Sequence, residues 1–320
     1  MPYLDFEINV KRAFNNVLQN FKNNEKKSER VELENYYQEK KTIIEEAIKE
    51  FLKIGDIERL EITRHLMKGG KKFRGFLALL VCDALNGSTE RALDAAVAIE
   101  LVHSSSLAHD DIMDLDEKRR GDFAAWVKFG LTKTILILHY LIPHAQLMIR
   151  KYGMAALETA IKTWETVVKG QIKDILMQET SAYETVAFLK TGGLFAGAAT
   201  LGAIAAERED FMDIASEYGR KFGFAYQIAD DIVDLNKYIK REISSTPTLN
   251  AFIRFLGYSS QFNDKIIDIA FGKLDKGIRA TVGLVKQFPD SKYKILLEKF
   301  PTFCVAQMLN EAKLNFNSRF

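Results

Sequence analysis

The stretch ERALDAAVAIELVHSSSLAHDDIMD, residues 90–114, contains neither glycine nor proline, the two residues least compatible with a helix interior. Its apolar side chains recur at helical spacing, which predicts one long helix. Residues 155–180 and 208–238 show the same periodicity, and the whole chain has only five prolines. No run of β-branched residues alternates with polar ones, so we predict no strands. The sequence therefore predicts an all-α fold.

No linker rich in glycine, serine or proline divides the chain. We therefore expect residues 1–320 to form a single large all-α domain, with peripheral N-terminal helices over the lysine- and glutamate-rich residues 1–55. Several predicted helices are apolar on most faces, so the bundle is expected to surround a central cavity. Glycine and proline positions predict the helix breaks, at 69–70, 87–88, 121–122, 152–153, 192–193 and 244–247.

The composition is that of a soluble globular protein, with 47% hydrophobic and 28% charged residues. A net charge of +2 gives no reason to expect nucleic acid or an anionic membrane as a partner. Cys82 and Cys304 form no metal or redox motif, which is typical of a reducing compartment. The N-terminus shows no secretory signal. The most apolar run, residues 134–148, is too short to span a bilayer and is expected to be a buried helix. We therefore predict a cytoplasmic protein without a transmembrane segment.

The first predicted helix ends in the motif DDIMD, residues 110–114. Residues i and i+4 share a helix face, so Asp110 and Asp114 present two carboxylates side by side, while Asp111 is rotated by about 100°. Carboxylate oxygens in this arrangement suit Mg²⁺, which usually binds through one or two carboxylates plus substrate phosphates. The motif recurs as DDIVD, with Asp230 and Asp234 in the same places. A single acidic motif is more often a solvated surface, but both copies lie within apolar helices, which favours two metal half-sites.

Cationic side chains that suit phosphate accompany both motifs. Each alone is more often an ordinary surface charge; together with the aspartates they predict a pocket for two diphosphates. They are Arg119 and Arg120 in RRG, Lys71, Lys72 and Arg74 in GGKKFR, and Lys190 in KTGG, where Thr191 follows.

These elements, in this order, resemble the trans-isoprenyl diphosphate synthases, over about residues 60–240. The matching segments are GGKKFR, IELVHSSSLAHDDIMD, RRG, GQIKD, KTGG and YQIADDIVD. The resemblance implies a helical bundle of the isoprenoid synthase type, usually a homodimer. It also implies Mg²⁺-dependent elongation of an allylic diphosphate with isopentenyl diphosphate, with release of pyrophosphate.

The resemblance also implies roles for individual residues. Metal would be held by Asp110, Asp114, Asp230 and Asp234, with Asp111 and Asp231 completing the catalytic aspartates. The allylic diphosphate would contact Arg119, Lys190, Thr191 and Gln227. Isopentenyl diphosphate would contact Lys71, Arg74, His103 and Arg120. Gln171 and Asp174 match the family's Gln and Asp on the helix that faces the first motif.

The residues before Asp110 bear on product length. Ser106 lies one helical turn before Asp110, and Val102 lies two turns before it, at about 5.4 Å per turn. In the family, bulky aromatic residues four or five positions before the first aspartate resemble a floor that stops chain growth. Here Ser105 and Ser106 are small, so the expected product is geranylgeranyl diphosphate (C20) or longer. The alternative is that both serines only pack against a neighbouring helix.

The chain departs from the family pattern at three places. Gly75 replaces the usual proline after GGKxxR, and Trp126 replaces a usual histidine. Residues 235–252 lack the Gly-Lys and Lys-x-Thr elements that close over the diphosphate, so Lys237 or Lys240 is the candidate substitute. The alternatives are a class I terpene cyclase, a non-catalytic regulatory subunit of a prenyl diphosphate synthase, and a purely structural helical protein.

Overall fold

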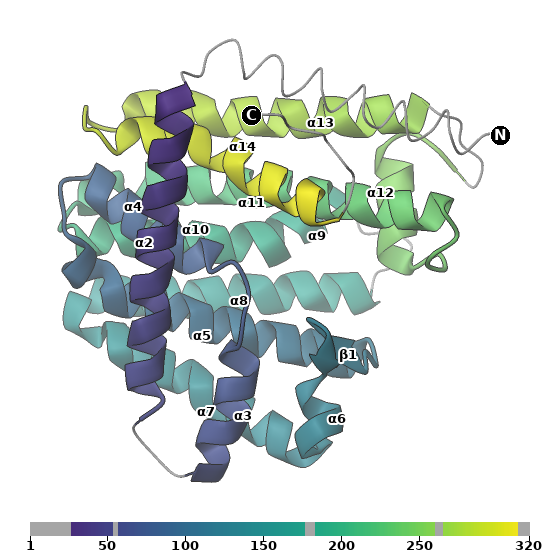
Figure 1. The fold of residues 1–320 in the computed structure, drawn as a ribbon, viewed down its shortest axis with the longest axis horizontal. Coiled ribbons are helices and arrows are strands. Elements are labelled where there is room, and N and C mark those ends of the chain that lie inside the picture. Colours follow the sequence, from purple (N-terminus) through teal and green to yellow (C-terminus); the bar gives the residue numbers. More distant parts are fainter. Residues whose placement is uncertain (1–26, 54–56, 177–182, 260–264, 313–320) are drawn as a thin grey trace. The chain divides into compact units, whose positions relative to one another are not determined.

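The computed structural model describes residues 27–53, 57–176, 183–259 and 265–312, and it is almost entirely helical (Figure 1). In chain order the elements are α2 (Lys27–Phe51), α3 (Ile57–Met67), α4 (Phe73–Ala84), α5 (Thr89–Met113), β1 (Lys118–Arg119), β2 (Asp122–Phe123), α6 (Ala125–Phe129), α7 (Leu131–Ile149), η1 (Arg150–Tyr152), α8 (Met154–Leu176), α9 (Tyr183–Ala187), the π-helix η2 (Phe188–Gly192), α10 (Gly193–Ala205), η3 (Glu209–Phe211), α11 (Met212–Ile239), α12 (Pro247–Phe255), α13 (Lys265–Val282), η4 (Gly283–Gln287) and α14 (Lys294–Glu311).

The chain divides into two compact units. The first comprises residues 1–34, 163–196 and 216–320, and the second comprises residues 35–162 and 197–215. In the second unit α5 packs against both α4 and α7, and α4 is buried along nearly its whole length. The part of α2 within this unit buries Tyr37 and Ile44, and the ring of Tyr37 meets Phe76 edge-on at 5.3 Å. The first aspartate motif therefore stands at the end of a helix fixed by neighbours on several sides.

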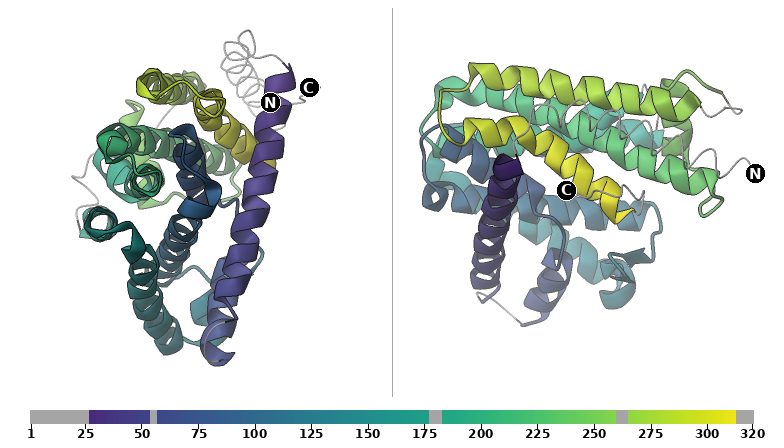
Figure 2. Two further views of the ribbon diagram at one scale, coloured as in Figure 1. Left: turned by 90° about the vertical axis from the view of Figure 1, so that its left-hand side faces the viewer. Right: turned by 45° about the horizontal axis from the view of Figure 1, so that its top comes forward.

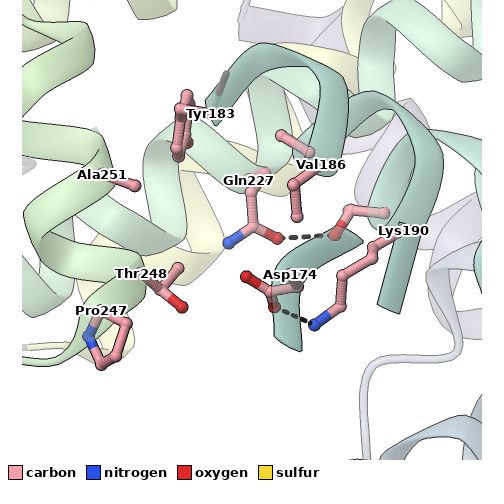
Figure 3. A pocket seen from close by; sticks show the side chains of 10 residues that line it. Asp174, Tyr183, Val186, Lys190, Gln227, Pro247, Thr248 and Ala251 are labelled. Carbon is pink, nitrogen blue, oxygen red and sulfur yellow. Dashed lines mark hydrogen bonds and ion pairs between the residues drawn. The ribbon is translucent and has the colours of Figure 1, made fainter. Parts of the chain in front are cut away.

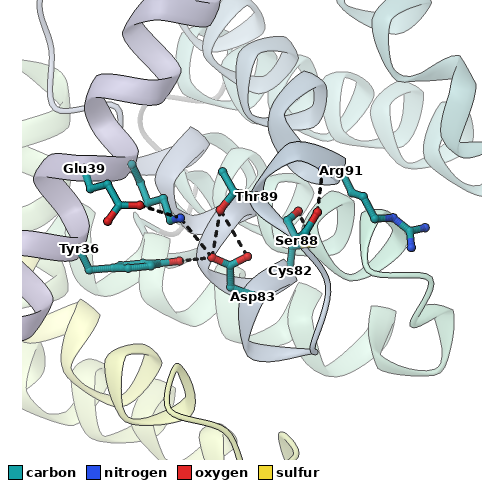
Figure 4. Close-up of polar contacts among 8 residues, drawn as sticks. Tyr36, Glu39, Cys82, Asp83, Ser88, Thr89 and Arg91 are labelled. Carbon is teal, nitrogen blue, oxygen red and sulfur yellow. Dashed lines mark hydrogen bonds and ion pairs between the residues drawn. The ribbon is translucent and has the colours of Figure 1, made fainter.

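A buried carboxylate joins α2 to α4 in the same unit (Figure 4). Asp83 is 5% exposed and accepts hydrogen bonds from the hydroxyls of Tyr36, at 2.6 Å, and Thr89, at 3.2 Å. The ammonium of Lys40 lies 3.6 Å from the same carboxylate. Ser88 caps the N-terminus of α5 by accepting from a main-chain N–H of its first turn. Burying a charged group is tolerated when donors and a counter-charge surround it in this way.

The core of the first unit gathers α11, α12, α13 and the end of α14. Side chains such as Ile228, Phe252 and Phe271 form one apolar cluster there. Within this unit α13 packs against α14 (Figure 2). The helix α12 packs against α9. The second aspartate motif lies on α11, and Ile232 within that motif is completely buried in the cluster.

The structure corrects several expectations. The predicted break at 192–193 is wrong, because the chain passes there from η2 directly into α10. Two short strands, β1 and β2, form a hairpin that the sequence did not predict. The run 134–148 is helical but not wholly buried, since Leu136 is 63% and Leu147 is 55% exposed. The end of the predicted helix over 155–180 lies outside the described residues.

Candidate active site

The first aspartate motif closes α5, which ends at Met113. Its carboxylates differ in exposure: Asp110 is half-buried, Asp114 is exposed, and Asp111 is 2% exposed. Asp111 accepts a hydrogen bond from Nε of Arg119. Burial raises the pKa of Asp111 above its ordinary value, and the neighbouring guanidinium opposes that shift. The protein therefore holds the middle aspartate and leaves the outer two accessible.

The β1–β2 hairpin directs Arg119 and Arg120 to different places. The turn residues Arg120 and Gly121 have φ angles of 53° and 79°. Positive φ at both central positions is typical of a type I′ turn and explains the glycine of RRG. Arg119 faces Asp111, whereas Nη1 of Arg120 donates to the carbonyl of Lys68 at 2.8 Å. The two arginines thus belong to different clusters.

Arg120 reaches the GGKKFR loop that precedes α4. A Cβ placed on Gly70 would lie 2.8 Å from Nη2 of Arg120, so glycine leaves room for the guanidinium. Lys72 is 4% exposed, and its ammonium donates to the last carbonyl of α3 at 2.9 Å. Burial lowers the pKa of Lys72. The carbonyl of Lys71 accepts from the hydroxyl of Tyr37 at 2.7 Å, while its side chain stays half-buried. Lys71 therefore remains accessible to a ligand, and Lys72 supports the loop.

Arg74 and His103 form the second part of this cluster. Nη1 of Arg74 lies 2.9 Å from Nε2 of His103. Burial and the nearby Arg74 hold the pKa of His103 well below its ordinary value, so the neutral ring accepts this hydrogen bond. The buried carboxylate of Glu100 accepts from the main-chain N–H of Gly75 at 2.9 Å. The family's usual proline at position 75 could not make that bond, because proline has no N–H. Sequence reasoning noticed Gly75 but missed Glu100.

The second motif repeats the exposure pattern of the first. Asp230 is exposed, Asp234 is half-buried, and Asp231 is 4% exposed. Asp231 accepts a hydrogen bond from the hydroxyl of Tyr183, and burial raises the pKa of Asp231 well above its ordinary value. Burial also raises the pKa of Tyr183, which keeps that hydroxyl protonated as a donor. Lys237 donates to Asp234 at 2.7 Å, so this candidate lid lysine does lie beside the motif.

A cavity within the first unit is lined by Lys190 and Thr191 of the KTGG segment and by Gln227, which precedes the second motif on α11 (Figure 3). Lys190 lies in the π-helix η2, a form often found at functional sites. Its ammonium pairs with Asp174 at 2.8 Å. Thr191 donates to Oε1 of Gln227 at 2.6 Å, and Nε2 of Gln227 donates to Asp231 at 3.3 Å. One polar wall of the cavity is therefore formed by Asp174, Lys190, Thr191 and Gln227.

Two glycines let neighbouring helices approach the KTGG segment at van der Waals distance. A Cβ on Gly223 of α11 would lie 2.6 Å from Cα of Gly192 and 2.8 Å from the carbonyl oxygen of Thr191. A Cβ on Gly170 of α8 would lie 2.9 Å from the main-chain nitrogen of Lys190. This close approach is the physical reason that a glycine pair here packs a helix and does not break it.

The atypical segment after the second motif contributes the opposite wall of the cavity. Thr246 caps α12, and Pro247, Thr248 and Ala251 of α12 line the cavity (Figure 3).

Near the first motif, Trp126 donates a hydrogen bond from its indole nitrogen to the carbonyl of residue 116. Of these two departures from the family pattern, the segment after the second motif thus ends in the helix α12, and Trp126 is held by a hydrogen bond.

The three candidate chain-length residues do not share one environment. Ser105 is completely buried and donates to the carbonyl one turn before it, at 2.9 Å. Ser106 is half-buried and donates to the carbonyl of His103 at 2.8 Å. Val102 is half-buried as well, on the face that carries Ser106 and Asp110. Ser105 therefore packs inside the protein, while Ser106 and Val102 follow the accessible face that leads to the first aspartate.

The oxygen donors of the two aspartate motifs determine which metal ion they can hold. Over residues 27–53, 57–176, 183–259 and 265–312, no group of three or more His, Cys, Asp or Glu side chains is arranged to hold one. Each motif instead offers two accessible carboxylates. This donor set fits Mg²⁺, which keeps several waters and takes further oxygens from substrate phosphates.

Known proteins resemble this chain over much of its length. A family model described as polyprenyl synthetase matches residues 58–242. Hexaprenyl pyrophosphate synthase of Saccharolobus solfataricus is 33% identical over 294 residues, covering 88% of this chain and 98% of that protein. Geranylgeranyl diphosphate synthase of Sulfolobus acidocaldarius is 33% identical over 218 residues, covering 63% of this chain and 66% of that protein.

Solved structures give the same result. Geranylgeranyl pyrophosphate synthetase from Pyrococcus horikoshii Ot3 has a TM-score of 0.68 at 29% identity, covering 86% of this chain and 98% of that one. A geranyltranstransferase from Methanosarcina mazei has a TM-score of 0.72 at 27% identity, covering 86% and 97%. The predicted all-α fold and the class of enzyme, a prenyltransferase that elongates isoprenyl chains, are confirmed. The chain belongs to the polyprenyl synthetase family.

Within the part of the chain that the structure describes, one helical stretch, Tyr183–Ala205, is long and apolar enough to cross a membrane. In the structure 78% of its apolar window is buried inside the protein. The core helices of soluble proteins pass the same test, so length and composition alone are a weak indication of a membrane span. The cytoplasmic location stays a prediction.

Proposed function

We propose that this protein is a Mg²⁺-dependent prenyltransferase that joins an allylic diphosphate to isopentenyl diphosphate and releases pyrophosphate. One observation carries the proposal. Both aspartate motifs leave their outer carboxylates accessible and bury the middle one against a donor from elsewhere in the chain, Arg119 for Asp111 and Tyr183 for Asp231. A solvated acidic surface has no reason to repeat this arrangement.

The accessible carboxylates of Asp110, Asp114, Asp230 and Asp234 would hold the magnesium ions. When bound, magnesium neutralises the diphosphate and makes pyrophosphate a better leaving group. The carboxylates need only anchor the ions, because the substrate supplies further oxygens.

The allylic diphosphate would be held by Arg119, Lys190, Thr191 and Gln227. Their donors stabilise the negative charge that grows on pyrophosphate as the carbon–oxygen bond breaks. The bonding electrons leave with pyrophosphate, and an allylic carbocation remains.

Isopentenyl diphosphate would be held by Lys71, Arg74, His103 and Arg120. Its double bond attacks the carbocation, and loss of a proton then restores a double bond in a product longer by five carbons. A terpene cyclase needs no second diphosphate site. The Arg74–His103 pair and Arg120 at the GGKKFR loop therefore favour elongation over cyclisation.

The product is proposed to be geranylgeranyl diphosphate or longer. The face of α5 that leads to Asp110 carries only a small and a medium side chain in the two preceding turns, Ser106 and Val102. The names of the relatives run from geranylgeranyl to hexaprenyl diphosphate synthase, which supports the same range.

We also propose a homodimer. The helix α7 exposes Leu136 and Leu147, which lie on one helix face with Pro143. An apolar stripe of this kind on a helix is typical of an interface. Light scattering should give twice the chain mass of 36.4 kDa for the wild type, and Leu136→Glu should shift the protein toward the monomer.

The activity is tested by incubating the purified chain with isopentenyl diphosphate and each of geranyl, farnesyl and geranylgeranyl diphosphate. Product chromatography should show elongation with Mg²⁺, none in excess chelator, and recovery when Mg²⁺ is restored. Turnover that persists in chelator would refute the metal sites. Cyclic hydrocarbon formed without isopentenyl diphosphate would support the cyclase, and no turnover with any starter would support a regulatory subunit.

A further inference from the structure

Tyr183 lies in the cavity of the first unit, and nothing in the single sequence marks it (Figure 3). It is 6% exposed and sits at the start of α9, seven residues before Lys190. Its hydroxyl donates to the carboxylate of Asp231, the middle aspartate of the second motif. A buried hydroxyl thus donates to a buried carboxylate, and both lie beside the proposed substrate-binding residues.

The hydrogen bonds continue beyond this pair. Asp231 also accepts from Nε2 of Gln227, at 3.3 and 3.4 Å to its two oxygens. With its amide nitrogen so engaged, Gln227 turns Oε1 toward the hydroxyl of Thr191, which donates at 2.6 Å. The carboxylate of Asp231 accepts, so Gln227 faces it with its amide nitrogen, and Oε1 of Gln227 is left to accept from Thr191. The series Tyr183–Asp231–Gln227–Thr191 therefore sets the orientation of the amide of Gln227.

The ring of Tyr183 is fixed by aromatic packing. It stacks on Phe255 at 4.8 Å and meets Phe252 at 5.2 Å, both on α12, and it meets Phe224 of α11 at 6.3 Å. Substituting phenylalanine would keep these contacts and remove only the hydroxyl. The hydroxyl is thus a rigid donor supplied by the interface of α9 with α12, and Asp231 is held by it.

We propose that Tyr183 is a positioning residue for the allylic diphosphate site. It holds Asp231, and through Asp231 it orients the amide of Gln227, whose nitrogen carries a second N–H that can donate to the diphosphate. In this account the buried Asp231 supports the substrate-binding side chains, while the accessible Asp230 and Asp234 face the metal. The inference rests on the proposed function, since it concerns the substrate of that same site.

The test compares Tyr183→Phe with a matched control, Tyr218→Phe. Tyr218 is buried in the first unit like Tyr183, and its hydroxyl donates one hydrogen bond to the carbonyl of Leu297 at 2.6 Å. That bond touches none of the proposed substrate-binding residues. Each substitution therefore removes one buried hydroxyl and its hydrogen bond, but only one is expected to affect the site.

We expect Tyr183→Phe to raise the KM for the allylic diphosphate about tenfold, the loss expected for one hydrogen bond to a charged group. The KM for isopentenyl diphosphate should stay within twofold of the wild type, and Tyr218→Phe should leave both KM values unchanged. A second measurement uses Thr191→Val. If the hydrogen bonds act as a series, Tyr183→Phe should have less effect in that background than in the wild type.

The outcomes separate the inference from the proposed function. An active wild type whose allylic KM is unchanged by Tyr183→Phe overturns the inference and leaves the proposed function standing. Equal rises in both KM values in Tyr183→Phe and Tyr218→Phe also overturn it, because they indicate general loosening. A folded wild type without any turnover overturns the proposed function itself. If Tyr183→Phe fails to fold, the allylic KM of Gln227→Leu in the wild-type background decides: no change there overturns the inference.

Discussion

Gly223→Ala should displace the segment that carries Lys190 and Thr191. The added Cβ would lie 2.6 Å from Cα of Gly192 and 2.8 Å from the carbonyl oxygen of Thr191, whereas ordinary contacts begin at 3.4 Å. The backbones must therefore separate by about 0.8 Å, the difference between 3.4 and 2.6 Å. Both atoms belong to the main chain, so no rotamer change can absorb the contact.

Two effects follow. Overpacking of this kind costs about 1–3 kcal/mol of the free energy of unfolding. A displacement near 1 Å in a site that orients a reacting group can reduce activity about 100-fold. We expect Gly223→Ala to unfold at lower urea concentration and to lose about 10- to 100-fold in kcat/KM for the allylic diphosphate.

The matched control is Gly272→Ala, in the interior of α13. A Cβ at Gly272 meets nothing within 4 Å. Alanine there should raise the free energy of unfolding by about 0.5–1 kcal/mol, because it is the better helix former, and kcat/KM should not change. A Gly223→Ala variant that is folded by circular dichroism and retains the wild-type kcat/KM would refute the displacement of Lys190 and Thr191.

Four further substitutions test the remaining parts of the site. Asp110→Ala and Asp230→Ala should each reduce kcat by orders of magnitude, because each removes an accessible carboxylate proposed to hold metal. The circular dichroism spectrum should not change. Near-normal kcat in either variant would exclude a metal ligand on that helix. Arg74→Ala should mainly raise the KM for isopentenyl diphosphate, since the guanidinium contacts the diphosphate in both ground and transition states; an effect confined to the allylic substrate would mean that the two diphosphate sites are exchanged. Ser106→Phe should shorten the main product by about one five-carbon unit, because one helical turn has about that length, and overpacking should cost about 1–3 kcal/mol in stability. An unchanged product distribution would show that Ser106 does not limit product length.

The long helices could be predicted because periodicity is a local property. The stretch 90–114 became α5 with a shift of one residue at each end, and 208–238 became η3 and α11. The break at 192–193 could not be excluded locally. Glycine has two uses, flexibility and close approach, and only the position of Gly223 on another helix decides between them. Pro143 likewise lies inside α7, although proline usually ends helices.

The aspartate motifs show where local reasoning ends. Spacing alone separates the outer carboxylates from the middle one, since i and i+4 share a face and i+1 does not. Spacing cannot show what the middle carboxylate meets. For Asp111 the partner is Arg119, eight residues later, supplied by a hairpin whose type I′ turn the sequence marks only by one glycine. For Asp231 the partner is Tyr183, from a different helix 48 residues earlier.

The two partners differ in kind, and that difference has a consequence for charge. A guanidinium offsets the buried charge of Asp111, whereas the hydroxyl of Tyr183 and the amide of Gln227 only donate neutral hydrogen bonds to Asp231. In the second motif the lysine Lys237 pairs with an outer aspartate, Asp234, and not with the middle one. Burial accordingly raises the pKa of Asp231 well above its ordinary value, whereas at Asp111 the guanidinium of Arg119 opposes the same effect. Two motifs with the same spacing thus hold their buried carboxylates by different means, a charged donor in one and neutral donors in the other.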